Sequence, residues 1–191
     1  MLDATEAAAA WLARRRARRR WAALRSQGMS IGQDVDLPDS TWVDSAHCYL
    51  ISIGDHCRFG PECLILSHDA QMDEFLDAGR LGRVVIHPWS QLGARVTVMA
   101  GVEIGPRTIV LPHAMVVRSL PADSVCGGNP ARRLRGLEEF LAERREELAR
   151  QPRFDRAQFD RMSTTAEGRV ALASSLASVG GWVTEDPGPG A

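Results

Sequence analysis

One histidine, His68, stands where a repeat pattern in the chain breaks off, and its imidazole suits proton transfer near neutral pH. The next residue, Asp69, offers a carboxylate that could orient the imidazole or hydrogen-bond an acceptor molecule. Both residues also have ordinary explanations, because a lone histidine is usually a surface residue and aspartate often bonds the backbone of a turn. The pair therefore indicates general base catalysis only if the surrounding elements leave the imidazole within reach of a substrate.

An aliphatic or aromatic residue recurs every six positions along the middle of the chain. The phase slips by four residues after Val43, and after Ile65 it resumes only at Ile86. The positions are Ile31, Leu37, Val43, Ile53, Phe59, Ile65, Ile86, Leu92, Val98, Ile104, Val110 and Val116. Period six fits neither an amphipathic helix nor a simple alternating strand. It predicts a triangular coil, in which each six-residue face is a short strand plus a turn and stacked coils bury a continuous core.

A second regularity lies four residues after these positions, where the side chains are small or β-branched. The residues are Val35, Thr41, Cys57, Cys63, Ser90, Val96, Val102, Thr108 and Ala114. A small inward side chain suits the corner of a triangular coil, so Cys57 and Cys63 are predicted to fill the core rather than to act as nucleophiles. Glycine follows several of the aliphatic residues, and we expect these glycines to supply unusual backbone angles in the turns.

Helical segments are predicted on both sides of the coils. Residues 4–27 are rich in Ala and Arg, lack Pro and end at Gly28, a natural helix stop. Residues 136–150 carry apolar residues at helical spacing, Pro152 follows them, and a further helix is predicted over 166–178. The predicted organisation is an N-terminal helical segment at 1–28, a β-helix domain at 29–135 with a loop at 70–84, a C-terminal helical extension at 136–183 and a disordered tail at 184–191.

Composition narrows the class of protein. The chain has 191 residues and a formal net charge of −1, which gives no overall bias toward nucleic acid. Six arginines lie within residues 14–20, a run that could attract an anionic membrane surface but more commonly forms a solvated or subunit-packing helix.

No stretch is long enough to span a bilayer and no signal peptide is visible, which favours the cytoplasm. The spacing of the four cysteines and five histidines does not resemble a zinc site, so no metal is expected.

Three stretches carry a family resemblance. They are IGDHCRFGPECLILSHDA at 53–70, the segment 101–135 that contains Gly128-Asn129-Pro130-Ala131, and PRFDRAQF with the later SVGGWV. They resemble the hexapeptide-repeat acyltransferases, and more narrowly the sugar O-acetyltransferases of bacterial polysaccharide synthesis, relatives of the maltose and galactoside acetyltransferases. The resemblance covers about residues 30–183. It implies a mainly β fold, a left-handed parallel β-helix with N-terminal and C-terminal α-helical appendages.

The same resemblance implies transfer of an acetyl group from acetyl-CoA to a hydroxyl of a sugar or sugar-containing acceptor, with His68 as general base. It implies a homotrimer with active sites between subunits. Asp69 and Trp89 are the candidate substrate contacts, although Trp89 could also be a coil corner that a neighbouring subunit covers. The candidate contacts to the coenzyme's phosphates are Arg118, Arg132 and Arg133, because a planar guanidinium suits phosphate, but each could equally be a solvated surface charge.

The sequence departs from the family pattern at two places. His87 stands where glycine usually follows the aliphatic residue, and Leu111-Pro112-His113-Ala114 replaces the usual Gly-Ala-Gly-Ser, which affects the path of the coenzyme. Three alternatives therefore stay open: N-acetylation of an amino sugar, a non-catalytic trimeric scaffold, and a zinc enzyme of the γ-carbonic anhydrase type. The last is disfavoured because no third histidine follows His87 at short spacing.

Overall fold

The computed structural model describes residues 4–177 and 180–185, and the chain divides into two compact units. One unit is Ala9–Glu139, and the other combines Met1–Ala8 with Phe140–Ala191. Across the described residues, every helix is too short or too polar to traverse a lipid bilayer.

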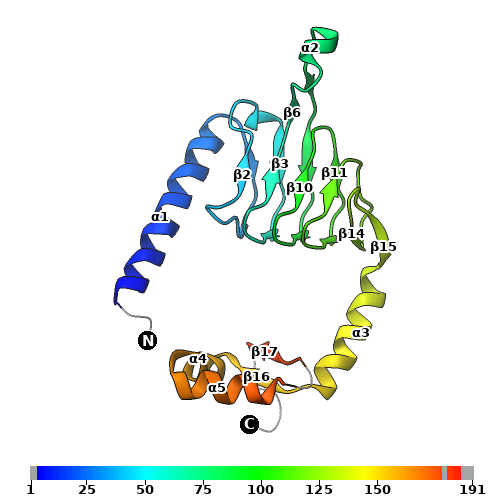
Figure 1. The fold of residues 1–191 in the computed structure, drawn as a ribbon. Helices are drawn as coiled ribbons and strands as arrows, with labels where there is room; N and C mark the ends of the chain where they lie inside the picture. Colours follow the sequence, from blue (N-terminus) through cyan, green and yellow to red (C-terminus); the bar gives the residue numbers. More distant parts are fainter. Residues whose placement is uncertain (1–3, 178–179, 186–191) are drawn as a thin grey trace. The chain divides into compact units, whose positions relative to one another are not determined.

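Short parallel strands build three sheets in the unit Ala9–Glu139, and successive coils add strands to each sheet (Figure 1). The first sheet has the order β1-β3-β8-β11: β1 (Ser30–Ile31), β3 (Ile51–Ile53), β8 (Val84–Ile86) and β11 (Glu103–Ile104). The second has the order β4-β9-β12-β14-β15: β4 (Arg58–Phe59), β9 (Gln91–Leu92), β12 (Ile109–Val110), β14 (Ser124–Gly127) and β15 (Arg132–Gly136). The third has the order β2-β5-β10-β13: β2 (Trp42–Val43), β5 (Leu64–Ile65), β10 (Thr97–Val98) and β13 (Met115–Val116). This arrangement is a parallel β-helix. Strand β15, which the sequence did not predict, runs antiparallel to β14 and ends the second sheet.

The strand registers give the length of each coil. Thr97 pairs with Met115, 18 residues further on, which corresponds to three hexads. Trp42 pairs with Leu64, 22 residues on, and Leu64 pairs with Thr97, 33 residues on. The residues beyond 18 in these two coils are the insertions that cause the two phase breaks of the sequence. Both breaks lie between a strand of the third sheet and a strand of the first sheet, so they leave the stack at the same corner, which we call the insertion corner.

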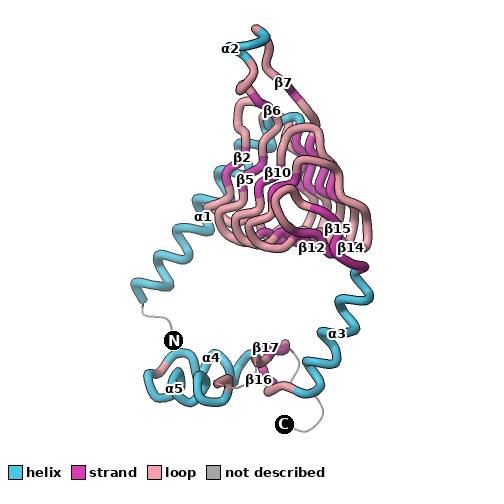
Figure 2. Tube along the Cα trace, turned by 45° about the vertical axis from the view of Figure 1, so that its right-hand side comes forward, coloured by secondary structure: helices cyan, strands magenta, loops and turns pink. Residues whose placement is uncertain are grey.

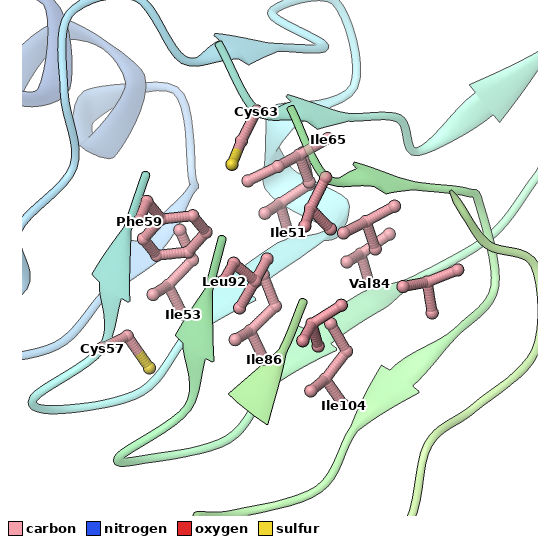
Figure 3. Packing of buried hydrophobic residues seen from close by; sticks show 14 of the residues in the cluster. Ile51, Ile53, Cys57, Phe59, Cys63, Ile65, Val84, Ile86, Leu92 and Ile104 are labelled. Atoms are coloured by element: carbon pink, nitrogen blue, oxygen red, sulfur yellow. The ribbon is translucent and has the colours of Figure 1, made fainter. Parts of the chain in front are cut away.

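Columns of side chains from successive coils form the core, and Figure 3 shows Ile53, Ile86 and Ile104 stacked in this way. Eleven of the twelve predicted period-six positions are buried. The exception, Ile31, lies in the first coil at the end of the stack and is partly buried. Cys57 and Cys63 are buried in the core as predicted. Each fully buried aliphatic side chain contributes roughly 1.5–3 kcal/mol, so the stack depends on many equivalent contacts.

The glycines that follow the aliphatic residues serve close packing between coils, and the expectation of unusual backbone angles is wrong for them. Among the described glycines, only Gly28, Gly101 and Gly128 have a positive φ. A Cβ on Gly54 would lie 2.6 Å from Cδ of Pro88, and one on Gly60 would overlap the backbone nitrogen of Ala94 in the next coil. Positive φ falls instead on the third residue after the aliphatic position, and those residues are Asp34, His56, Glu62, Trp89, Arg95, Arg107 and His113.

Gly60→Ala is expected to destabilise the β-helix by about 1–3 kcal/mol, since the added methyl group must push two coils apart. The measurement is the urea midpoint of unfolding. Gly136→Ala is the matched control, because a Cβ there would meet only the Arg133 guanidinium at an ordinary 3.5 Å. Equal midpoints for the two variants would show that coil spacing does not require glycine.

The predicted N-terminal helix is observed as α1 (Ala4–Ser26), and Gly28 follows it with a φ of +101°. Its last turns cover the first coil. Trp21 and Leu24 are buried there, and Nε1 of Trp21 donates a hydrogen bond of 3.0 Å to the carbonyl oxygen of Leu37. The last arginine of the basic run, Arg20, donates to the carbonyl oxygen of Asp39 at 2.8 Å. Helix α1 thereby protects the apolar end of the β-helix from water.

The two insertions differ in form. The first contains one 3-10 turn, η1 (Cys48–Leu50). The second is an arm in which β6 (His68–Asp69) pairs antiparallel with β7 (Arg80–Leu81), with the single turn α2 (Asp73–Leu76) between them (Figures 1 and 2). The predicted loop at 70–84 therefore contains regular structure, and its last residue, Val84, belongs to β8 and is fully buried.

The other unit holds more structure than the sequence predicted. Helix α3 (Leu137–Arg150) ends before Pro152 as expected. Strand β16 (Arg153–Asp155) pairs in parallel with β17 (Trp182–Thr184), and α4 (Arg156–Thr164) and α5 (Ala166–Ser175) lie between them in sequence. Oδ1 of Asp155 caps α4 by accepting a 2.6 Å hydrogen bond from the Gln158 backbone N–H. Thr184, assigned to the tail in the sequence analysis, lies in β17, and residues 186–191 of that predicted tail lie outside the described residues.

Candidate active site

His68 lies at the insertion corner, where the arm leaves the coil. Its side chain is 37% exposed, and Nδ1 lies 2.6 Å from Oδ2 of Asp44, whose own side chain is 2% exposed. Asp44 directly follows β2, and Val43 of β2 pairs with Ile65 of β5, so the two residues belong to neighbouring coils. The corner therefore joins a reachable imidazole to a carboxylate that is shielded from solvent.

Asp44 accepts hydrogen bonds at both carboxylate oxygens. The Ser67 hydroxyl donates to Oδ2 at 2.7 Å, and the backbone N–H of His47 donates to Oδ1 at 3.3 Å. Burial acts to raise the pKa of Asp44, but the hydrogen bonds from His68 and Ser67 outweigh it and lower this pKa from 3.8 to about 2. An ionised carboxylate accepts but cannot donate, so it favours the neutral imidazole tautomer with hydrogen on Nδ1. That tautomer leaves the Nε2 lone pair of His68 free to take a proton.

This pKa shift predicts how the stability of the fold depends on pH. The pKa of Asp44 is lower in the folded chain than its ordinary value of 3.8, so its contribution is complete above that value. The contribution is lost as the pH falls through about 2. The unfolding free energies of the wild type and Asp44→Asn should therefore differ at pH 6 and converge on acidification below about pH 4. A difference that stays constant to pH 2 would contradict this assignment.

A second histidine, His47, completes the group. Its ring lies against that of His68, with centroids 4.8 Å apart and planes at 51°. Nδ1 of His47 is 3.5 Å from Oδ2 of Asp44. This nitrogen is buried and, among the residues that the structure describes, has no hydrogen-bond partner. The backbone of His47, in contrast, is anchored, because its N–H reaches Asp44 and its carbonyl oxygen lies 3.1 Å from the Ser67 hydroxyl.

Asp69 does not orient the imidazole, although it is next to His68 in the sequence. Its Oδ1 accepts a 2.9 Å hydrogen bond from the backbone N–H of Gln71, which is the local turn bonding noted as the alternative. Strand β6 gives the physical reason, because successive side chains of a strand point to opposite sides. Asp44 takes the orienting position, and a direct contact of Asp69 with substrate stays a prediction.

No family model matches the chain, but individual proteins do. The putative colanic acid biosynthesis acetyltransferase WcaF of Escherichia coli is 34% identical over 134 residues, which cover 59% of this chain and 72% of WcaF. The chain belongs to the hexapeptide-repeat acetyltransferases. The putative acetyltransferase YvoF of Bacillus subtilis is 29% identical over 112 residues, and the match spans 59% of this chain and 63% of YvoF, less than two thirds of that relative. A maltose O-acetyltransferase from Clostridium difficile shares the fold of this hexapeptide-repeat chain, with a TM-score of 0.51, 19% identity and coverage of 63% of this chain and 75% of that one.

The other predicted site residues of this hexapeptide-repeat chain are spread over the coil. Arg118 follows β13 at the insertion corner, two coils beyond the arm, which corresponds to about 10 Å of strand spacing. Trp89 lies at the corner between the first and second sheets, 57% exposed and stacked on His56 with a centroid distance of 4.2 Å. Arg132 and Arg133 are exposed on β15 of the second sheet, which does not border the insertion corner. Within one chain, only Arg118 therefore shares a corner with His68.

The sequence did not predict that Asp44, His47 and Ser67 lie in one site with His68. A signal was available in the repeat. The breaks after Val43 and Ile65 lie 22 residues apart, which is one 18-residue coil plus the four-residue slip. Counting this way places both breaks at one corner, and the polar residues after each break then face one another.

Proposed function

We propose that this chain is an acetyl-CoA-dependent O-acetyltransferase that acts on a hydroxyl of a sugar or sugar-containing acceptor, with a left-handed β-helix as its scaffold. The observation that carries the proposal is the 2.6 Å contact between Nδ1 of His68 and the shielded carboxylate of Asp44. Membership of the acetyltransferase family supports the donor. The polysaccharide-related name of WcaF supports a saccharide acceptor.

The chemistry follows from the tautomer of His68. Nε2 takes the proton of the acceptor hydroxyl while the hydroxyl oxygen bonds to the thioester carbon of acetyl-CoA. The tetrahedral intermediate then expels the coenzyme A sulfur, and the proton on Nε2 passes to that sulfur. The products are an acetyl ester and free coenzyme A, and His68 returns to its starting state. The Asp44 carboxylate stabilises the imidazolium that exists between the two proton transfers.

The proposed assembly is a homotrimer with the active site between neighbouring chains. Trp89, Arg132 and Arg133 are distant from the insertion corner along the coil, so they can join His68 only if another copy supplies them. A guanidinium from a neighbouring coil would suit the phosphates of coenzyme A, because it presents a planar pair of donors. Sedimentation of the purified full chain at three times the monomer mass is the expected result.

The test is an assay of free thiol release. The purified chain is incubated with acetyl-CoA and a panel of neutral sugars, amino sugars and oligosaccharides, and the products are identified by mass spectrometry. The expected outcome is acceptor-dependent thiol release with an alkali-labile acetyl ester on a hydroxyl. An alkali-stable amide would indicate N-acetylation instead. Absence of acceptor-dependent release across the panel, from an assembled protein that binds acetyl-CoA, would favour the scaffold alternative.

A further inference from the structure

Three side chains that could ligate a metal converge at the insertion corner. Asp44, His47 and His68 each offer one ligand atom, and these atoms all lie within 4.8 Å of one another. His68 Nδ1 lies 2.6 Å from Asp44 Oδ2, and His47 Nδ1 lies 3.5 Å from the same oxygen. The catalytic proposal uses the first contact and leaves the second unexplained.

The imidazole of His47 is the unexplained part. Its Nδ1 is buried and lacks a hydrogen-bond partner in the described part of the chain, whereas buried polar atoms in native proteins almost always have one. The carboxylate oxygen 3.5 Å from it already accepts hydrogen bonds from His68 and Ser67. A cation between these groups would give the His47 nitrogen, the carboxylate and the second imidazole a common partner.

We propose that Asp44, His47 and His68 form an inhibitory site for a divalent transition-metal ion of the Zn²⁺ type, a regulation that rests on the proposed function. Zinc binds imidazole nitrogen and carboxylate oxygen at about 2.0–2.2 Å in tetrahedral geometry, which sets neighbouring ligands about 3.3 Å apart. The contact between His68 and Asp44 has to lengthen by less than about 1 Å to reach that value, while that between His47 and Asp44 already matches it within a few tenths of an ångström. Three protein ligands leave the fourth position for water.

Inhibition follows from where the proton of His68 must go. In the catalytic pair, Nδ1 carries the hydrogen and Nε2 holds the free lone pair. When Nδ1 donates its lone pair to zinc, the single proton of the neutral imidazole has to lie on Nε2. Nε2 then cannot accept the proton of the acceptor hydroxyl. Zinc therefore removes the general base without displacing either substrate.

The chain offers a matched control for nonspecific zinc binding. His56 also faces a carboxylate, with its Nδ1 2.9 Å from Oδ2 of Asp34, but this pair is exposed and, within residues 4–177 and 180–185, has no third ligand. The Arg58 guanidinium, 2.7 Å from the same Asp34 oxygen, repels a cation there. The four cysteines are buried and thus shielded from added metal.

The experiment titrates the purified assembled protein with Zn²⁺ against a chromogenic chelator, in the wild type, His47→Gln and His56→Gln. His47→Gln keeps the backbone contacts of residue 47, and the inhibition of each protein is measured relative to its own rate without zinc. We expect one Zn²⁺ per chain in the wild type and in His56→Gln, and at least about ten-fold weaker binding in His47→Gln, since loss of even an outer-shell partner costs about 10- to 100-fold. Zinc should inhibit acetyl transfer by the wild type, the chelator should reverse the inhibition, and His47→Gln should need at least about ten-fold more zinc.

X-ray absorption of the zinc-loaded wild type provides a readout that needs no variant. Two imidazoles with oxygen ligands are expected, and a sulfur ligand would overturn the proposal. It is also overturned if His47→Gln binds zinc as tightly as the wild type, if His56→Gln removes the binding, or if transfer continues at full zinc occupancy. Because binding is measured without substrates, a chain that binds zinc as expected but transfers no acetyl group would refute the proposed function and leave the metal site intact.

Discussion

His68→Ala is expected to lower kcat/KM for acetyl transfer by about 10²–10⁴-fold, the usual contribution of a general base. Without Nε2, the acceptor hydroxyl has to lose its proton to water while it attacks the thioester. The imidazole is partly exposed at a corner and does not belong to the buried columns, so the coils and the assembly should remain intact. The measurement is thiol release at subsaturating acceptor, together with the sedimentation and thermal unfolding of the variant.

His87→Ala is the control for this substitution. His87 is also a histidine of a coil turn, its side chain is 39% exposed, and its Nε2 lies 3.4 Å from Oε2 of Glu103. It follows β8 at the corner that also holds Trp89, away from the insertion corner of the same chain. Because it does not contact His68, we expect its variant to lower transfer far less than His68→Ala does. Equal activity of His68→Ala and the wild type would remove His68 from the mechanism.

Asp44→Asn is expected to lower kcat by about 10²–10⁴-fold with little change in the KM for acetyl-CoA, since the wrong imidazole tautomer is favoured. Both oxygens of Asp44 accept hydrogen bonds, one from His68 and Ser67 and the other from the His47 backbone. An amide has only one acceptor. If its oxygen faces His47, its NH₂ group donates to Nδ1 of His68 and places the proton on Nε2. If its oxygen faces His68, its NH₂ group lies opposite the backbone N–H of His47, so two donors meet without an acceptor.

Asp34→Asn is the matched control, because Oδ2 of Asp34 likewise pairs with an imidazole, that of His56, at 2.9 Å. This pair is exposed at the corner that holds Trp89 and does not contact His68, so its loss should lower kcat far less than Asp44→Asn does. The pH profile of kcat separates a positioning role of Asp44 from a general loss of folded protein, because a smaller amount of active enzyme would lower the apparent kcat without shifting that profile. A wild-type kcat in Asp44→Asn would show that the carboxylate does not set the tautomer.

The repeat made the scaffold predictable, because a period of six constrains every coil through the same packing requirement. Ile86, Ile104 and their equivalents must all point inward, and one sequence pattern reports them all. The role of the glycines was not predictable in the same way, since Gly54 and Gly60 are required by the backbone of the next coil rather than by their own φ. Strands β15, β16 and β17 carry no repeat, so the sequence offered no period from which to infer them.

His68 was predictable as a candidate because the chain departs from its repeat there, but its partner was not. Asp44 and His68 are 24 residues apart, and the neighbour in sequence, Asp69, was the simpler choice. That Asp44 and His68 lie at the same corner becomes clear only when the four-residue slip is added to the 18-residue coil. The same count brings His47 to the site, which the spacing of histidines alone did not suggest.

The placement of both insertions at a single corner gives the molecule a modular design. The strands on either side of the arm, β5 and β8, keep the pairing of an uninterrupted coil, as Leu64 with Thr97 and Val85 with Glu103 show. The segment 70–79, between the two strands of the arm, can therefore be shortened, extended or exchanged with that of another protein without shifting the register of the solenoid. Exchanging this segment offers a way to change the acceptor preference while the β-helix stays the same, because loops on a solenoid vary independently of its core.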